Sequence, residues 1–185
     1  MAAFEEVGAI PGVLIVTPDI HRDARGLFVE TFRRAWIPNG REMVQANRAD
    51  RQAGSAVGLH FHRHQADYWY VPFGRARVVL HDLRVVEPGP DSTLTLDLGA
   101  MPDGEHDHRG VYIPPGVAHG FAALTDMTIT YLVDGYYDSA DELGVAWDDP
   151  EIGADWGVED PVLSERDRSN PRRAVLDLTG STWRA

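Results

Sequence analysis

Residues 57–64 read Val-Gly-Leu-His-Phe-His-Arg-His, so imidazole side chains occupy every second position from His60. Successive side chains of a β-strand point to opposite faces of the sheet. His60, His62 and His64 are therefore expected on one face of the strand. The apolar residues Val57, Leu59 and Phe61 are expected on the other face. This pattern predicts a polar pocket lined by the histidine face, with a second sheet or subunit packed on the apolar face.

Short runs rich in β-forming residues recur on both sides of this strand, and clusters of Gly, Pro and Asp separate them. Regularly spaced short strands with turn signals predict an all-β chain folded as an antiparallel sandwich or barrel. Helical patterns are confined to residues 33–36 and 161–168. The predicted strands cover residues 13–16, 27–32, 57–62, 68–71, 77–84, 93–98, 111–113, 120–124 and 128–133.

The length of 185 residues predicts one domain over residues 1–185. The segment after Trp147 is acidic and rich in Pro, and we expect residues 147–185 to form an extension that packs on the barrel. The sequence contains no apolar run long enough to span a membrane, and its N-terminus lacks the pattern of a signal peptide. A cytoplasmic protein is therefore expected.

Charge and composition exclude several classes of function. The net charge is −12, which disfavours nucleic acids and anionic membranes as partners. The chain contains no Cys, and all 17 basic residues are Arg. Disulfides, thiolate catalysis and lysine Schiff bases are thereby excluded, and any mechanism must use His, Asp, Glu, Tyr and Arg.

Two longer patterns resemble the signature motifs of the cupin superfamily of jelly-roll β-barrels. They are Gly54-x5-His60-x-His62-x4-Asp67-x6-Gly74 and Pro114-x-Gly116-x2-His119. The resemblance implies that His60, His62, Asp67 and His119 can bind one divalent metal, and such a set suits Fe, Mn, Ni or Zn. The residues alone leave an alternative open, in which His60, His62 and His64 are surface residues on an exposed edge strand and Asp67 is a solvated turn residue.

Further segments, in order, resemble the dTDP-4-dehydrorhamnose 3,5-epimerase family, a branch of the cupins. The resemblance implies an isomerase that acts on a nucleotide-diphosphate 4-keto-6-deoxy sugar at C3, C5 or both, and that requires no cofactor. It extends over roughly residues 8–170. The segments that carry it are residues 23–30, 45–47, 58–61, 65–66, 81–84, 113–121, 131–137, 147–156 and 163–167.

The resemblance also implies roles for individual residues. His60 is the general base, Asp167 orients its imidazole, and Tyr131 is the acid that returns a proton to the opposite face of the sugar. A homodimer is implied, in which an exchanged N-terminal strand completes the partner's site. The residues implied in substrate binding are Arg25, Phe28, Glu30, Gln45, Asn47, His119 and Tyr137.

Two departures from the family pattern affect the expected mechanism. Val57 stands where the family carries Arg, and Asp67 stands where it carries a Lys beside the developing enolate. A metal held by the four cupin positions would replace the lost cation, but it would also occupy His60. Three hypotheses follow: a metal-independent epimerase, a metal-dependent isomerase or oxygenase, and a non-catalytic sugar-nucleotide-binding cupin.

Overall fold

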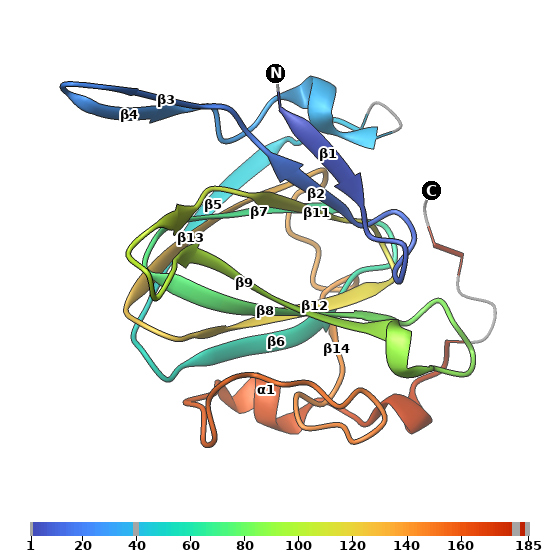
Figure 1. Cartoon of the computed structure of the whole chain (residues 1–185). Coiled ribbons are helices and arrows are strands. Elements are labelled where there is room, and N and C mark those ends of the chain that lie inside the picture. Colours follow the sequence, from blue (N-terminus) through green and yellow to red (C-terminus); the bar gives the residue numbers. More distant parts are fainter. Residues whose placement is uncertain (1, 39–40, 179–181, 184–185) are drawn as a thin grey trace.

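Two six-stranded antiparallel sheets stack face to face in the computed structural model, which describes residues 2–38, 41–178 and 182–183 (Figure 1). The first sheet has the order β1 (Ala3–Glu6), β2 (Leu14–Thr17), β11 (Gly110–Ile113), β7 (Asp67–Phe73), β13 (Met127–Val133) and β5 (Gln45–Arg51). The second has the order β10 (His106–Asp107), β9 (Thr93–Ala100), β8 (Arg75–Asp82), β12 (Val117–Ala123), β6 (Ala56–Phe61) and β14 (Leu143–Gly144). The predicted antiparallel β architecture is confirmed.

A separate hairpin, β3 (Ile20–Asp23) and β4 (Gly26–Val29), pairs only with itself among the described residues and extends away from the two sheets (Figure 1). Its apolar side chains remain largely in solvent, and Phe28 is 64% exposed. Ile20 and Leu27 of the same hairpin are also exposed, so the hairpin carries three large apolar side chains in solvent.

The main core fills the space between the sheets. Side chains of β7, β8, β12 and β13, such as Val71, Leu80 and Ile129, are fully or almost fully buried there. A second apolar cluster lies on the outer face of the second sheet, where Leu59 and Phe61 of β6 meet Trp156 of the C-terminal segment. Burial of these faces removes apolar area from water and so stabilises both layers.

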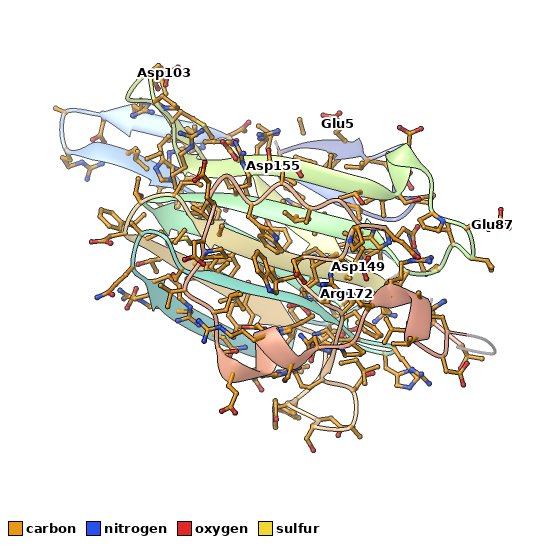
Figure 2. All side chains as sticks on the ribbon, turned by 90° about the horizontal axis from the view of Figure 1, so that it is seen from below. Glu5, Glu87, Asp103, Asp149, Asp155 and Arg172 are labelled. Atoms are coloured by element: carbon orange, nitrogen blue, oxygen red, sulfur yellow. The ribbon has the colours of Figure 1, made fainter. Side chains whose placement is uncertain are left out.

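The C-terminal segment covers the outer face of the second sheet (Figure 1). It contains α1 (Glu165–Ser169) and the 3-10 turn η4 (Arg173–Val175), and the other short turns are η1 (Arg34–Trp36) and η3 (Pro90–Ser92). Figure 2 shows Asp149 and Arg172 on this covered side, where the Arg173 backbone N–H donates to Asp149 Oδ2 at 2.6 Å. None of the helices within the described residues is long and apolar enough to cross a membrane.

The alternation predicted for residues 57–64 breaks at Gly58. Its φ is +109°, and a Cβ there would lie 2.8 Å from the Gly120 Cα on β12, so only glycine fits. The pairing of β6 with β12 shifts register at the same level. Val57 consequently faces the inter-sheet core instead of the outer face, which corrects the prediction for that residue. The strand ends at Phe61, and His64 lies in the following turn with its side chain exposed.

Candidate active site

A cavity of about 110 Å³ lies between the two sheets at the level of the histidine strand. Side chains from β5 and β13 of the first sheet and from β6 and β12 of the second contribute to its wall, so both layers are needed to form it. The residues that line it are Ala49, Arg51, Val57, His60, His62, Gln65, Asp67, Trp69, His119, Phe121, Ile129, Tyr131 and Glu142.

His60 lies on β6 and lines the cavity, and its Nε2 contacts a residue of α1. The His60 Nε2 lies 2.7 Å from Asp167 Oδ1. A carboxylate accepts this hydrogen bond, so Nε2 carries the proton and Nδ1 is the nitrogen left with a lone pair. The predicted pairing of His60 with Asp167 is therefore present in the structure.

Asp167 is fixed by the local structure of α1. Ser164 caps the helix, its Oγ accepting from the Asp167 backbone N–H at 3.1 Å and donating to Oδ2 at 2.7 Å. Burial alone would raise the pKa of the Asp167 carboxyl, but the hydrogen bonds from His60 and Ser164 outweigh it and lower this pKa below its usual range. The group facing His60 is thus a carboxylate.

Tyr131 comes from β13, on the sheet opposite His60. Burial, together with the nearby Asp67 carboxylate, raises the pKa of the Tyr131 phenol above its usual value. The phenol is therefore protonated at neutral pH and can act as a proton donor. His60 and Tyr131 thus place a base and an acid in the walls of one cavity, on opposite sheets.

A second polar group lies in the same cavity and consists of His62, Asp67 and His119. Their ligand atoms lie within 4.8 Å of one another, and all three side chains are buried. Asp67 Oδ1 lies 4.0 Å from His62 Nε2, and Oδ2 lies 4.0 Å from His119 Nε2. The structure thus brings together three of the four residues predicted to bind a metal.

The fourth, His60, lies outside this group, and its Nε2 is engaged by Asp167. The prediction of a four-ligand set is corrected to a three-residue cluster. One imidazole, that of His60, is thus paired with a carboxylate, and those of His62 and His119 face Asp67. The alternative of an exposed edge strand is wrong for His60 and His62, because β6 lies between β12 and β14 and His62 is buried, but His64 is exposed as that alternative supposed.

The predicted substrate-binding residues fall into two sets. Gln45 and Asn47 lie on the half-buried face of β5, the face that also carries the cavity residues Ala49 and Arg51. Asn47 pairs across the sheet with Tyr131.

His119, which belongs to the same prediction, lines the cavity, whereas the other four residues lie away from its wall. Arg25 and Phe28 are on the projecting β3–β4 hairpin, and Glu30 follows it, ion-paired with Arg33. Tyr137 is 70% exposed in the loop after β13. The chain by itself does not bring these residues to the site.

Arg51 and Glu142 are cavity residues that sequence reasoning did not identify. Arg51 was detectable, because it lies four residues after Asn47 and therefore on the same face of the strand as Gln45 and Asn47. Glu142 lies in the loop before β14 and carries no such periodic signal.

Comparison with known proteins gives consistent matches over nearly the whole chain. The family model for dTDP-4-dehydrorhamnose 3,5-epimerase matches residues 8–174. A dTDP-4-dehydrorhamnose 3,5-epimerase from Methanothermobacter thermautotrophicus is 35% identical over 170 residues, covering 87% of this chain and 89% of that protein. A dTDP-4-dehydrorhamnose 3-epimerase from Streptomyces niveus is 37% identical over 168 residues, covering 86% of this chain and 78% of that protein.

A solved structure gives the same result for the fold. The dTDP-6-deoxy-D-glucose-3,5-epimerase of Legionella pneumophila, in complex with dTDP-4-keto-L-rhamnose, superposes with a TM-score of 0.82 at 26% identity. The match covers 96% of this chain and 95% of that one. The cupin-like jelly roll predicted from the two motifs is confirmed.

Proposed function

The chain belongs to the dTDP-4-dehydrorhamnose 3,5-epimerase family of sugar-nucleotide isomerases, and from this premise we propose that it epimerises a nucleotide-diphosphate 4-keto-6-deoxy sugar at C3, C5 or both. One observation carries the proposal. His60, paired with Asp167 at 2.7 Å, shares a cavity with a protonated Tyr131 from the opposite sheet. Inversion of a carbon centre requires a base on one face and an acid on the other, and this arrangement supplies both.

The chemistry is a proton transfer through an enolate. The C4 carbonyl acidifies the hydrogens at C3 and C5, and His60 Nδ1 takes one of them while the C–H electron pair moves into the enolate. Asp167 stabilises the imidazolium that forms. Tyr131 then gives its phenolic proton to the opposite face of the same carbon, the carbonyl re-forms, and solvent reprotonates Tyr131 and deprotonates His60.

Binding of the diphosphate requires cations in an acidic protein. Val57 lines the cavity where the family carries Arg, and Arg51 lines the same cavity from β5. We assign Arg51, with Gln45 and Asn47 on the same strand face, to the nucleotide-diphosphate end of the substrate. A guanidinium suits this role because it forms paired hydrogen bonds with phosphate oxygens.

A homodimer completes the site in this proposal. The β3–β4 hairpin carries Arg25 and Phe28 away from its own barrel, with Phe28 exposed. β5 is an edge strand of the first sheet, and edge strands with free N–H and C=O groups pair readily with added strands. The hairpin of one subunit would then reach the partner's cavity along this edge.

The test is incorporation of solvent deuterium into a dTDP-4-keto-6-deoxy sugar in D₂O, followed by NMR at C3 and C5. The wild-type chain should label one or both positions. His60→Asn should reduce labelling by at least about 100-fold, which is the usual contribution of a general base. His64→Asn, an exposed histidine in the turn after the same strand, is the matched control and should label normally.

Two outcomes would contradict the proposal. Undiminished labelling by the His60 variant would remove His60 from the role of base. Tight binding of several nucleotide sugars with no labelling by the wild type would favour the non-catalytic binding hypothesis.

A further inference from the structure

We propose that His62, Asp67 and His119 form a divalent-metal site in the wall of the cavity. The site is separate from the His60–Asp167 pair. Its use in catalysis rests on the proposed epimerase function, whereas its existence does not.

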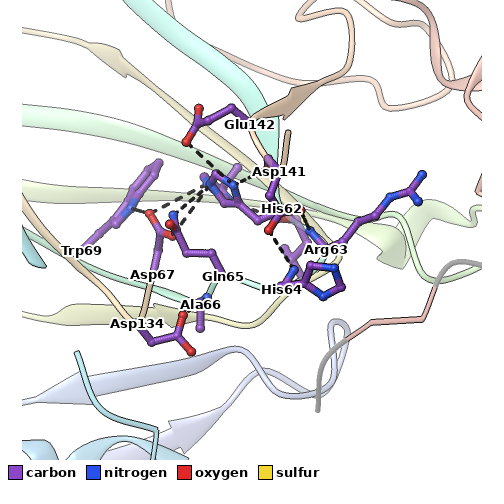
Figure 3. Close-up of polar contacts among 12 residues, drawn as sticks. His62, Arg63, His64, Gln65, Ala66, Asp67, Trp69, Asp134, Asp141 and Glu142 are labelled. Carbon is purple, nitrogen blue, oxygen red and sulfur yellow. Dashed lines mark hydrogen bonds and ion pairs between the residues drawn. The ribbon is translucent and has the colours of Figure 1, made fainter. Parts of the chain in front are cut away.

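The first argument is geometric. The three residues are no more than 5% exposed, and their ligand atoms converge within 4.8 Å. Each histidine Nε2 lies 4.0 Å from a different oxygen of Asp67. Protein ligands bind first-row dications at roughly 2.0–2.2 Å, so one ion can bridge atoms at this separation. Figure 3 shows the His62 ring directed at the Asp67 carboxylate.

The second argument concerns the protons of the two imidazoles. His62 Nδ1 donates to the Asp141 carbonyl at 2.8 Å, and His119 Nδ1 donates to the Val117 carbonyl at 2.9 Å. Each ring is thereby fixed with an unprotonated Nε2 directed into the cluster. Outward hydrogen bonding of the second nitrogen to a carbonyl is the arrangement typical of histidines that ligate metals.

Asp67 is oriented in the same way. Its Oδ2 accepts from Trp69 Nε1 at 3.0 Å, and its Oδ1 accepts from Gln65 Nε2 at 3.0 Å. The Gln65 amide also lies 3.2 Å from His62 Nε2 and donates to it. The Gln65 N–H group therefore lies between the lone pairs of Asp67 Oδ1 and His62 Nε2. A cation would take the same position.

The third argument concerns the charge that an enolate oxygen would meet at this wall of the cavity. The His119 ring uses its Nδ1 proton on the Val117 carbonyl, so its Nε2 presents a lone pair to the cavity and offers no hydrogen bond to a carbonyl oxygen. Asp67 adds a negative charge beside it. An enolate oxygen placed here would meet lone pairs and a carboxylate, whereas a bound dication would attract it. The metal would thus supply the positive charge that the family's lysine supplies, as a Lewis acid on the C4 oxygen.

The donor set identifies the class of metal. Two imidazole nitrogens and one carboxylate favour Zn, Fe, Mn, Co or Ni over Mg or Ca, which prefer oxygen ligands. Three protein ligands also leave coordination positions for water or a substrate oxygen, as catalytic sites require.

The experiment uses the untagged full-length chain, stripped with EDTA and dialysed. Zn²⁺ is titrated by isothermal calorimetry, and Co²⁺ is added in parallel while its visible d–d absorption is followed. We expect one saturable equivalent per chain and a Co²⁺ spectrum of low-symmetry nitrogen and oxygen coordination. Asp67→Asn and His119→Gln should each weaken binding by at least 100-fold, and both retain the volume of the side chain closely enough to preserve packing.

His64→Gln is the matched control, because it removes an imidazole two positions from His62 that points away from the cluster (Figure 3). It should bind Zn²⁺ like the wild type. Absence of a saturable equivalent in the wild type, or equal affinity in the Asp67 variant, would overturn the proposal.

The catalytic use of the metal is tested separately by deuterium labelling with the stripped and the Zn²⁺-loaded chain. Labelling by the stripped protein at the full rate would show that the epimerase function stands without the metal. Metal binding without labelling in any form would instead contradict the proposed function.

Discussion

The role that we propose for His60 depends, at the scale of a single residue, on the partner of its Nε2. Asp167 holds that nitrogen at 2.7 Å, and Ser164 and the Gly58 backbone N–H hold Asp167 in turn. His62 lies two residues further on, yet a backbone carbonyl instead of a carboxylate fixes its ring. Under the two proposals, the imidazole abstracts a proton at position 60 and ligates a metal at position 62.

Tyr131→Phe separates the two half-reactions of the proposed mechanism. Removal of the phenol leaves His60 able to take a proton and return it to the same face, so solvent exchange at the carbon should persist. Inversion should fall by about 10²–10⁴-fold, because general acids typically contribute that much. NMR that follows deuterium labelling and product configuration in one sample measures both.

Tyr136→Phe is the control for this variant, since Tyr136 is 76% exposed in the loop after β13. It should leave both rates unchanged. Equal loss of exchange and inversion in the Tyr131 variant would show that the phenol is needed before proton abstraction and is not simply the acid.

Single residues were predictable where a motif fixed their neighbours. The pairing of His60 with Asp167 and the cavity positions of Tyr131 and His119 are present as the family resemblance implied. The exclusion of His60 from the metal cluster was not predictable. It depends on which ring nitrogen each histidine presents, and for His60 and His62 that follows from contacts with Asp167 and Asp141, which lie far away in the sequence.

At the scale of elements, the strands with β-branched and aromatic residues were predicted and the polar ones were missed. β5, Gln45–Arg51, contains no β-branched residue, and its stability comes from pairing along its whole length with β13. The helix predicted over residues 161–168 is shorter in the structure. Ser164 is its N-cap, so α1 begins only at Glu165. The break in β6 was not predicted. The alternation rule assumes a regular pleat along the strand, and the pleat is interrupted at Gly58.

Gly74, in the tight turn between β7 and β8, provides a stability prediction at this scale. Its φ is +71°, and a Cβ would lie 2.1 Å from the Asp126 carbonyl oxygen and 2.6 Å from the Met127 Cα. Gly74→Ala adds a collision with backbone to the usual cost of a left-handed conformation. We expect it to lower the free energy of unfolding by about 3 kcal/mol or more.

Gly104→Ala is the matched control, because Gly104 also has a positive φ of +89° but no atom within 4 Å of its ideal Cβ. It should cost only about 1–2 kcal/mol, the conformational part alone. Denaturant unfolding at pH 7 measures both values. Equal losses in the two variants would show that the β7–β8 turn relaxes around the added methyl group.

At the scale of the whole molecule, the C-terminal segment is joined to the barrel through a buried polar chain. His81 of β8 is fully buried, and its Nδ1 donates to Thr93 Oγ1 at 2.8 Å. Thr93 Oγ1 in turn donates to the Ile152 carbonyl at 2.8 Å, in the segment that covers the second sheet. The remaining His81 Nε2 is buried without a hydrogen-bond partner among the described residues.

This arrangement makes the stability of the molecule sensitive to acid. Burial, with Arg173 nearby, lowers the pKa of His81 from 6.5 to about 4. The unfolded chain therefore binds a proton at this residue at a higher pH than the folded chain does. The free energy of unfolding must then fall as the pH drops from about 6.5 toward 4, and it is fully retained only above the unfolded pKa.

One unit of pKa difference corresponds to about 1.4 kcal/mol. For His81 alone, the free energy of unfolding should fall by roughly 2 kcal/mol between pH 7 and pH 5. Urea unfolding of His81→Asn across this range should show a pH dependence smaller by that amount. The asparagine amide still donates to Thr93, so the comparison isolates the lost titration from the lost hydrogen bond. His64→Asn, at an exposed position, should keep the wild-type dependence. An unchanged dependence in the His81 variant would mean that the C-terminal segment detaches before the histidine protonates, because a released segment would leave His81 hydrated in both states.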